Sequence, residues 1–566
     1  MRKIFLTILV IINSANSIAQ SPQSQYREAA ENLNFEIEVM AEKKLCPGVR
    51  LVKSCGNLVC EKNKRETIKN CPSDCLKGVK VRSYNNIILC QDYVSTQIPI
   101  NKEEVQDIIK KAIFKKSKVK VIGKSHSATD ILCSKGLALP MEKFDKVLGI
   151  TDSKYGKVVE AESGITVFKL SEWLSEKGYA LKGIPHMGFR DVSIGGAIAT
   201  ASHGSTPKHT GVLSNIVMAM EFVDGKGNIQ NREYDEDLIS NQKFEFKALR
   251  ASLGLLGVVT KMKLLIQPQF NLHVKTSYHR DSTILKRGLL NSIADCDFGQ
   301  FNWFPGSNKI VKTCGAKTAD KAKRGAQNRL LDPAIPPFLS KPFKQILQLG
   351  TCNNRVMCLM ERVRYWQFKL QPPFVYGGKK KKKRYSHNLV GKSHRMVSSH
   401  LTKSQAGFFQ MDWELAVPEK FIQPAFEAIY KMAKEKNICL PLVGVFIRFA
   451  PIDDATLIGH TSSLEKGPWQ KGKIAAFFEM PVYIPLGFSK KKFDQYEKKY
   501  RDFANMLIKN FHGRPHWGKN KTWTFEKVKD QGTYQTNLEQ FKKIAKKFDP
   551  NKIFTNKFSS EIGLTN

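Results

Sequence analysis

The chain has 566 residues and a formal net charge of +40, with 91 lysines and arginines against 51 aspartates and glutamates. This length allows a large core and more than one domain. No apolar segment reaches the length of a membrane helix. The charge indicates a surface that attracts polyanions, but it indicates neither a fold nor specific nucleic-acid binding.

The N-terminus has the pattern of a secretory signal peptide. Arg2 and Lys3 precede a short apolar run, and small residues ending at Ala19 follow it. The apolar run is too short to cross a bilayer. We therefore predict that residues 1–19 are a signal peptide and that the protein is secreted.

Residues 20–83 form a polar, cysteine-rich segment. Half of the chain's 12 cysteines lie close together, at Cys46, Cys55, Cys60, Cys71, Cys75 and Cys90. An even cluster behind a signal peptide predicts disulfides, although the sequence does not give their pairing. Zinc is the alternative, but the paired Cys-x-x-Cys and His-x-x-x-His spacings are absent. We expect no metal site.

A helix is expected next. Asn101 is a suitable N-cap with Glu104 three residues later, and apolar residues then recur at helical spacing. The β-branched run Val119–Ile122 predicts a strand directly after it. This strand ends in a loop of small and polar residues, Gly123, Lys124, Ser125, His126 and Ser127. Such a loop lets backbone N–H groups approach a phosphate or a ring edge closely.

A second small-residue loop follows at 193–205. It contains Gly195, Gly196, Thr200, His203, Gly204 and Ser205. Two loops of this kind, separated by a region of helices and strands, predict a large anionic cofactor bound in extended form. Between and beyond them we expect a helix at 167–177 and strands at 217–223 and 258–266, with a hairpin turn at 224–227.

The composition changes after about residue 270. Aromatic strands are expected at 301–305 and 408–417, and a longer helix at 424–436. The basic run 379–384 is typical of a solvated loop, with a polyanion anchor as the functional alternative. Asn520 begins a formal glycosylation sequon, which we expect to be unmodified because it adjoins the candidate site described next.

Four segments together resemble the flavin-dependent oxidoreductases of the vanillyl-alcohol oxidase type, specifically the aldonolactone oxidases. They are the loop Gly123–Ser127, the segment Gly195–Ser205, the stretch Ala251–Val259, and His516-Trp517-Gly518-Lys519. Four segments in the family's order are far more specific than any one alone. Lys124 departs from the usual small residue of the first loop.

The resemblance implies an α+β fold with a two-part FAD-binding domain of the PCMH type at 84–268. A substrate cap with an antiparallel sheet, together with a C-terminal flavin-site segment, would occupy 269–566. FAD would contact both small-residue loops, Ser163, Gly257 and Val258. His126 would be the attachment point if FAD is covalent, and His186 and His203 would shape the cofactor loops.

Three residues correspond to the family's catalytic positions. Arg448 would hold a substrate oxygen or stabilise negative charge on the flavin. Lys519 would stabilise reduced flavin, and His516 would act as a base or orient the substrate hydroxyl. The family's glutamate should stand two residues before Arg448, where this chain has Phe446. Substrate contacts should therefore differ, or another residue should act in its place.

The leading hypothesis is a secreted FAD-dependent oxidase of an aldonolactone, such as L-gulono-1,4-lactone, or of a related sugar. It would use O₂ as acceptor and release H₂O₂. One alternative is a dehydrogenase of the same fold or an oxidase of another carbohydrate. Another is a catalytically inactive basic protein that binds glycans or anionic membranes. The sequence does not give the substrate or the oligomeric state.

Overall fold

The computed structural model describes residues 75–186, 189–327, 349–370, 387–398, 410–484 and 490–565, with short pieces at 60, 62, 346–347, 374–376 and 383–385. The predicted signal peptide, most of the cysteine-rich segment and most of the basic run 379–384 lie outside the described residues. No helix in the described part of the chain is both long and apolar enough to cross a membrane.

The first part of the fold begins with helix α4 (Lys102–Phe114), whose N-cap is formed as the sequence predicts. The side chain of Asn101 accepts a hydrogen bond from the Glu104 N–H at 2.8 Å. The buried stripe of the helix is Val105, Ile108, Ile109 and Ala112, and it packs in one cluster with β4. A small parallel sheet of β3 (Ser95–Thr96), β5 (Leu137–Pro140) and β4 (Val119–Ile122) carries the first loop at its end.

A second sheet of six antiparallel strands completes the first domain. Its order is β10 (Ile229–Glu233), β9 (Val217–Val223), β11 (Val258–Pro268), β7 (Gly156–Glu162) and β6 (Val147–Ser153), with β8 (Tyr179–Leu181) also paired to β11. The helices are α5 (Val167–Glu176), α6 (Ile194–Ala199) and α7 (Ser240–Leu249). The hairpin expected at 224–227 joins β9 to β10, closed by the bond from Gly227 N–H to Asp224 O.

The second domain is built on an eight-stranded antiparallel sheet. Its order is β18 (Asn388–Lys392), β12 (Asn271–Arg280), β14 (Lys309–Thr318), β13 (Phe298–Phe304), β20 (Val445–Pro451), β21 (Ile474–Tyr483), β19 (Gln410–Pro418) and β22 (Arg514–Pro515). β20, β21 and β19 consist almost entirely of buried residues. The expected antiparallel cap sheet is therefore present.

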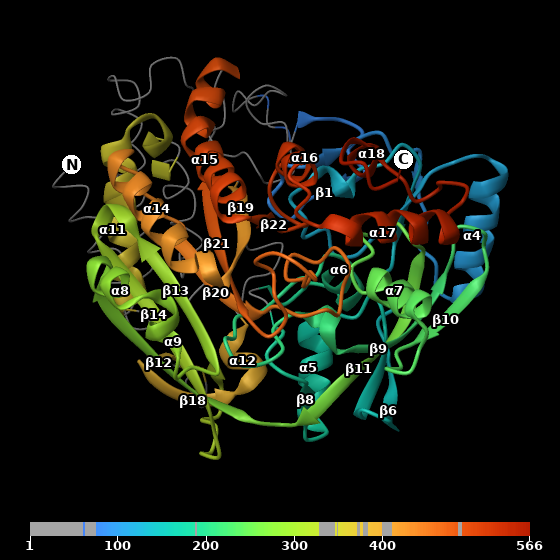
Figure 1. Ribbon diagram of the computed structural model, residues 1–566, viewed down its shortest axis with the longest axis horizontal. Helices are drawn as coiled ribbons and strands as arrows, with labels where there is room; N and C mark the ends of the chain where they lie inside the picture. The colour runs from blue at the N-terminus through green and yellow to red at the C-terminus, as the bar shows by residue number, and fades with distance from the viewer. Residues whose placement is uncertain are drawn as a thin grey trace.

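Helices surround this sheet, as Figure 1 shows on its left side. They are α8 (Asp281–Arg287), α9 (Leu289–Ile293), α11 (Asn354–Leu370), α12 (Ser393–Val397), α14 (Ile422–Glu435) and α15 (Lys490–Phe511). A minor sheet is formed by β15 (Ala326–Gln327), β16 (Phe374–Tyr376) and β17 (Lys383–Tyr385). α14 and α15 both pack against β19.

The C-terminal segment returns to the first domain. Helices α16 (Thr522–Asp530), α17 (Gln535–Phe548) and α18 (Lys557–Glu561) lie above the first domain in Figure 1, and α17 packs on α7. The Asp549 carboxylate accepts the N–H groups of Ile553 and Phe554 at 2.9 and 2.8 Å. The Ile553 carbonyl in turn accepts the Val119 N–H at 2.8 Å, so the chain end braces the strand that carries the first loop.

Disulfides join distant parts of the chain as well as near ones. The described pairs are Cys60–Cys75, Cys90–Cys133, Cys296–Cys314 and Cys358–Cys439. The expectation of disulfides in the N-terminal cluster is confirmed for Cys60, Cys75 and Cys90. Cys90 pairs outside that cluster, with Cys133.

Candidate active site

A cavity lies between the two domains and collects most of the residues singled out from the sequence. The predicted residues that line it are Gly123, Lys124, Ser125, His126, Ser127, Ser163, Gly195, Gly196, Thr200, His203, Gly257, Arg448, His516 and Lys519. The first domain supplies the small-residue loops, and the second domain supplies the charged residues. We call the part lined by the small-residue loops the cofactor end and the part lined by Arg448, His516 and Lys519 the substrate end.

Three predicted cofactor contacts do not line the cavity. Gly204 is packed so closely against backbone that an added Cβ would lie 2.3 Å from Ile184 O. The Ser205 hydroxyl faces the second domain, where it accepts the Phe449 N–H at 3.2 Å. Val258 is fully buried in the cluster beneath α4. These residues support the loops and strands around the cavity from outside it.

The shape of the first loop depends on the backbone conformation of Ser125 and on contacts with neighbouring segments. Ser125 has a φ of 56°, a conformation that side chains other than glycine rarely adopt. Its carbonyl accepts the Tyr84 N–H at 2.9 Å. A Cβ on Gly123 would lie 2.4 Å from Ser193 Oγ, so the absence of a side chain lets the two loops approach each other.

His126 is enclosed by aromatic rings at the cofactor end. Its ring stacks on Tyr84 with centroids 5.2 Å apart and lies 4.9 Å from Phe189. His126 Nε2 is 2.8 Å from Asp191 Oδ1. Within the described part of the chain, both ring nitrogens are buried and neither has a hydrogen bond of good geometry.

Lys120 is a buried cation that sequence analysis did not single out. It lies in β4, lines the cavity and donates from Nζ to Leu253 O at 3.0 Å. Burial lowers the pKa of the lysine to about 8. A buried cation beside two small-residue loops suits an anionic group in the cavity, because such a group would supply the countercharge.

Four charged side chains alternate in a closed ring at the substrate end. Arg448 Nη2 donates to Glu414 Oε1 at 2.6 Å and to Glu479 Oε2 at 2.9 Å. Lys519 Nζ lies 2.6 Å from Glu414 Oε2 and 2.5 Å from Glu479 Oε1. Two carboxylates and two cations thus compensate one another, and neither of the glutamates was predicted from the sequence.

The two glutamates have different surroundings. Glu414 has no exposed surface and also accepts His203 Nε2 at 2.9 Å. Burial opposes its ionisation, but Arg448 and Lys519 hold the pKa of this carboxyl well below its usual range. Glu479 lines the cavity, and burial raises the pKa of its carboxyl. Glu414 is therefore the fixed charge of the ring, and Glu479 is the carboxylate that faces the cavity.

His516 is positioned by the turn that follows β22. Its Nδ1 accepts the Gly518 N–H at 3.0 Å, so the proton of the neutral ring is on Nε2. Burial lowers the pKa of His516 well below its ordinary value, which keeps the ring neutral. Of the two roles expected for His516, this geometry favours orienting a substrate oxygen as a hydrogen-bond donor.

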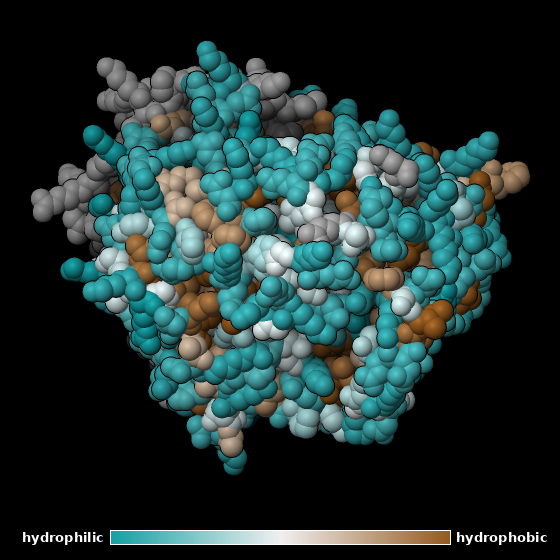
Figure 2. Space-filling model, in the orientation of Figure 1, coloured by the Kyte–Doolittle hydropathy of each residue, from teal (hydrophilic) through white to brown (hydrophobic). Residues whose placement is uncertain are grey.

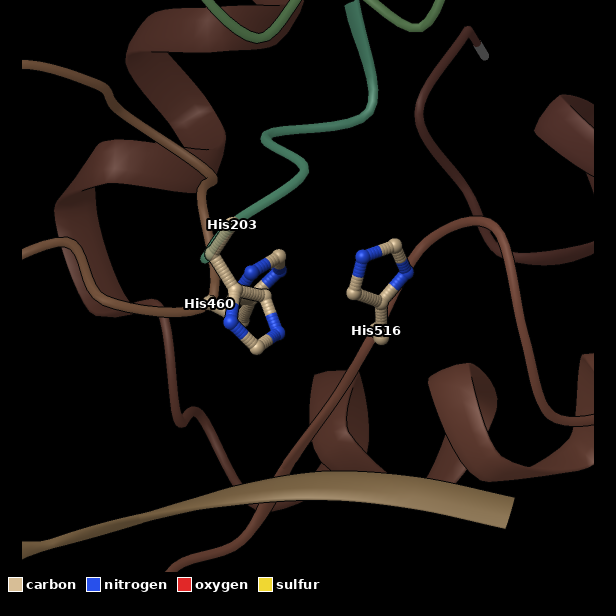
Figure 3. A group of neighbouring side chains, drawn as sticks. All are labelled: His203, His460 and His516. Carbon is tan, nitrogen blue, oxygen red and sulfur yellow. The ribbon is translucent and has the colours of Figure 1, made fainter. Parts of the chain in front are cut away.

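Three buried histidines meet beside the ring of charges. His203, His460 and His516 offer nitrogens within 4.8 Å of one another, and Figure 3 shows a ring nitrogen of His516 turned toward the other two. His203 Nδ1 lies 2.8 Å from Gly204 O and Nε2 lies 2.9 Å from Glu414 Oε1, and the neutral ring donates to only one of these acceptors. His516 uses Nδ1. The absence of a metal site stays a prediction.

Helix α11 fixes one wall of the cavity. It reaches the segment before β20 at three successive positions: Cys358 is bonded to Cys439, Glu361 Oε2 accepts the Leu440 N–H at 2.6 Å, and Arg364 Nε donates to Leu442 O at 2.6 Å. The wall formed by residues 441–443 lines the cavity, as does Arg364. Burial raises the pKa of Glu361 to about 7.

The comparisons with known proteins agree with this geometry. The family model described as D-arabinono-1,4-lactone oxidase matches residues 262–562, a little more than half of the chain, and the FAD binding domain model matches residues 96–232. The chain belongs to the D-arabinono-1,4-lactone oxidase family. As a member of this family it is an FAD-dependent oxidoreductase.

Relatives extend across most of the chain. L-gulonolactone oxidase of Mus musculus is 26% identical and is matched over 86% of this chain and 98% of its own. L-gulono-1,4-lactone dehydrogenase of Mycobacterium tuberculosis is 22% identical over 82% and 94%. The crystal structure of cholesterol oxidase from B. sterolicum shares the fold, with a TM-score of 0.69, 16% identity and coverage of 85% and 96%.

The cavity of this family member fits FAD. The close approach of Gly123 to Ser193 leaves the two loops without side-chain bulk between them, and the buried Lys120 offers a positive charge. When bound, FAD supplies a two-electron acceptor. The two small-residue loops, Ser163 and Gly257 would hold it, and Arg448 and Lys519 line the same cavity.

The residues that sequence reasoning missed share one property. Tyr84, Lys120, Glu414, His460 and Glu479 belong to no segment that resembles the family's motifs. Tyr84 donates to Asp412 Oδ2 at 2.7 Å, across the domain boundary. A lysine within the apolar strand 119–122 was the one available signal, because a charge in a buried strand needs a partner.

Proposed function

We propose that this protein oxidises an aldonolactone of the L-gulono-1,4-lactone kind, transferring its electrons through FAD to O₂ and releasing H₂O₂. The observation that carries the proposal is the ring of Arg448, Lys519 and Glu479 with His516 beside it, all lining the cavity that also contains the cofactor loops. Hydroxyl groups of a lactone match this mixture of donors and acceptors.

The side chains perform three tasks in this reaction. Arg448 and Lys519 place two positive charges where the negative charge of the reaction develops. His516 donates from Nε2 to a substrate oxygen and orients it. The apolar wall 441–443 and Phe446 exclude water from the reacting carbon.

FAD is covalently bound through His126 in this proposal. Both ring nitrogens of His126 are buried and have no hydrogen-bond partner among the described residues, although Nε2 lies 2.8 Å from Asp191 Oδ1. Either ring nitrogen could therefore carry the linkage. The test is the absorbance spectrum before and after acid precipitation. Flavin bands that remain with the precipitate support the linkage, and flavin released to the supernatant contradicts it while leaving FAD binding intact.

A panel of lactones with peroxide detection tests the reaction. We expect L-gulono-1,4-lactone or a related lactone to reduce the flavin anaerobically and to yield H₂O₂ in air. Reduction without peroxide, with an artificial acceptor required for turnover, would support the dehydrogenase alternative. One curated relative has dehydrogenase in its name, so both acceptors belong in the same experiment.

We also propose that the protein is secreted and that its basic surface binds polyanions. The signal-peptide pattern and the disulfides support secretion. The net charge of +40 supports polyanion binding, and hydrophilic residues cover most of the face in Figure 2. Secretion is tested by N-terminal sequencing of the protein from the culture medium. Binding is tested by elution from heparin against salt, where elution near physiological salt would contradict it.

A further inference from the structure

One carboxylate faces the cavity from an unexpected strand. Phe446 on β20 and Glu479 on β21 are direct partners in the ladder, and Glu414 on β19 is the direct partner of Glu479 on its other side. Directly paired residues project from the same face of a sheet. The three side chains therefore form one row, and the position at which the resemblance implies a glutamate, Phe446, is next to Glu479.

Only one carboxylate of this row is available to a substrate. Glu414 has no exposed surface and is bonded to His203, Arg448 and Lys519. Glu479 retains 8% exposure and lines the cavity together with Phe446 and His516. His516 carries its proton on Nε2, and the lone pair of Nδ1 already accepts the Gly518 N–H, so neither nitrogen has a free lone pair for a substrate proton.

We propose that Glu479 is the catalytic base of this enzyme. It lies on the neighbouring strand and performs the role that Phe446 cannot perform. The inference rests on the proposed function. As the substrate C–OH becomes C=O, the hydroxyl proton passes to a Glu479 oxygen, and the hydrogen on carbon leaves with its electron pair to the bound FAD. Arg448 and Lys519 keep the carboxylate in place, and Phe446 packs its ring 5.0 Å from the Arg448 guanidinium carbon.

The first test compares Glu479→Gln with wild type in anaerobic flavin reduction. We expect the limiting rate to fall by about 10²- to 10⁴-fold, the usual contribution of a general base. The wild-type rate should decrease toward acid pH as Glu479 becomes protonated, and the variant should lose this dependence. FAD content, the flavin spectrum and the thermal midpoint report whether the variant folds. A variant that holds FAD and keeps the wild-type rate and pH profile overturns the assignment.

The second test moves the carboxylate back across the ladder. The double variant Phe446→Glu/Glu479→Gln keeps the number of charges in the row, so it guards against a folding failure of the single variant. We expect its rate of flavin reduction to be at least about tenfold higher than that of Glu479→Gln, a part of what a general base contributes. Phe446→Glu alone is the control. No recovery in a double variant that holds FAD overturns the assignment. A wild-type enzyme that no lactone reduces overturns the proposed function itself, which separates the two failures.

Discussion

The two ends of the cavity are built from different kinds of sequence. The cofactor end consists of loops whose important residues are neighbours in the chain, at 123–127 and 193–203. The substrate end consists of single side chains from four segments, Glu414, Arg448, Glu479 and Lys519, which meet only in the folded sheet. A cofactor that is bound by backbone N–H groups requires a continuous loop of small residues. A substrate that is bound by buried charges requires that side chains from different strands neutralise one another.

This difference separates two sources of stability. Glu414 and Glu479 are direct cross-strand partners, and like charges opposite each other destabilise a sheet. Arg448 and Lys519 offset that repulsion, and each contacts both carboxylates. The substrate end is therefore a buried network in which every charge depends on the others, while the cofactor end depends on the absence of side chains.

The largest effect is expected from breaking the network. Glu414→Gln leaves Arg448, Lys519 and His203 with one carboxylate among them, and we expect the free energy of unfolding to fall by about 3–5 kcal/mol. Denaturant unfolding measures it. The matched control is Glu435→Gln on α14, whose side chain is 61% exposed in its pair with Lys431, where we expect a change under about 0.5 kcal/mol. Equal effects of the two variants would contradict the network.

Local sequence signals account for much of the cofactor end. Asn101 and the apolar stripe after it predict α4, the β-branched run predicts β4, and the expected hairpin turn at 224–227 follows the expected strand 217–223. The eleven lining residues predicted at that end come from segments in which several neighbours carry the pattern together. Short-range signals and a motif read in order found these residues because each loop is continuous in the chain, but they missed Tyr84 and Lys120, which lie outside the loops.

The substrate end could be predicted only in part. Arg448, His516 and Lys519 were identified because they lie in segments that resemble the family. Glu414 and Glu479 were not, because a glutamate in an apolar strand shows its partner only when the strand order and register are known. The register also shows why Phe446 does not leave Arg448 and Lys519 without a second carboxylate, because Glu479 lies directly opposite Phe446 on the next strand.

A pH-dependent effect is expected at the wall of the substrate end. Burial raises the pKa of Glu361 from 4.5 to about 7. The folded state therefore binds a proton more tightly than the unfolded state. This contribution to stability is complete below about pH 4.5 and is lost as the pH rises to about 7, by ~3 kcal/mol in total. Denaturant unfolding at pH 5 and pH 8 compares wild type with Glu361→Gln.

The glutamine variant isolates this proton. Glu361→Gln keeps an oxygen that accepts the Leu440 N–H but has no charge to form. We expect the stability of the variant relative to wild type to increase between pH 5 and pH 8. A stability difference between variant and wild type that does not change with pH would contradict this prediction. It would mean that folding does not raise the pKa of Glu361.

The smallest effect, at the cofactor end, tests whether missing side chains define it. In Gly123→Ala the new Cβ would lie 2.4 Å from Ser193 Oγ but 3.7 Å from Ser193 Cβ. We expect a loss of about 1–3 kcal/mol in the free energy of unfolding from overpacking, with less FAD retained on purification. Because only the hydroxyl oxygen is too close, Gly123→Ala/Ser193→Ala should recover most of both losses, and Ser193→Ala alone is the control. FAD content and thermal unfolding measure the outcome. A double variant with the same FAD content and stability as Gly123→Ala would contradict this explanation. The glycine would then be required for its backbone conformation, and not for the close approach of the two loops.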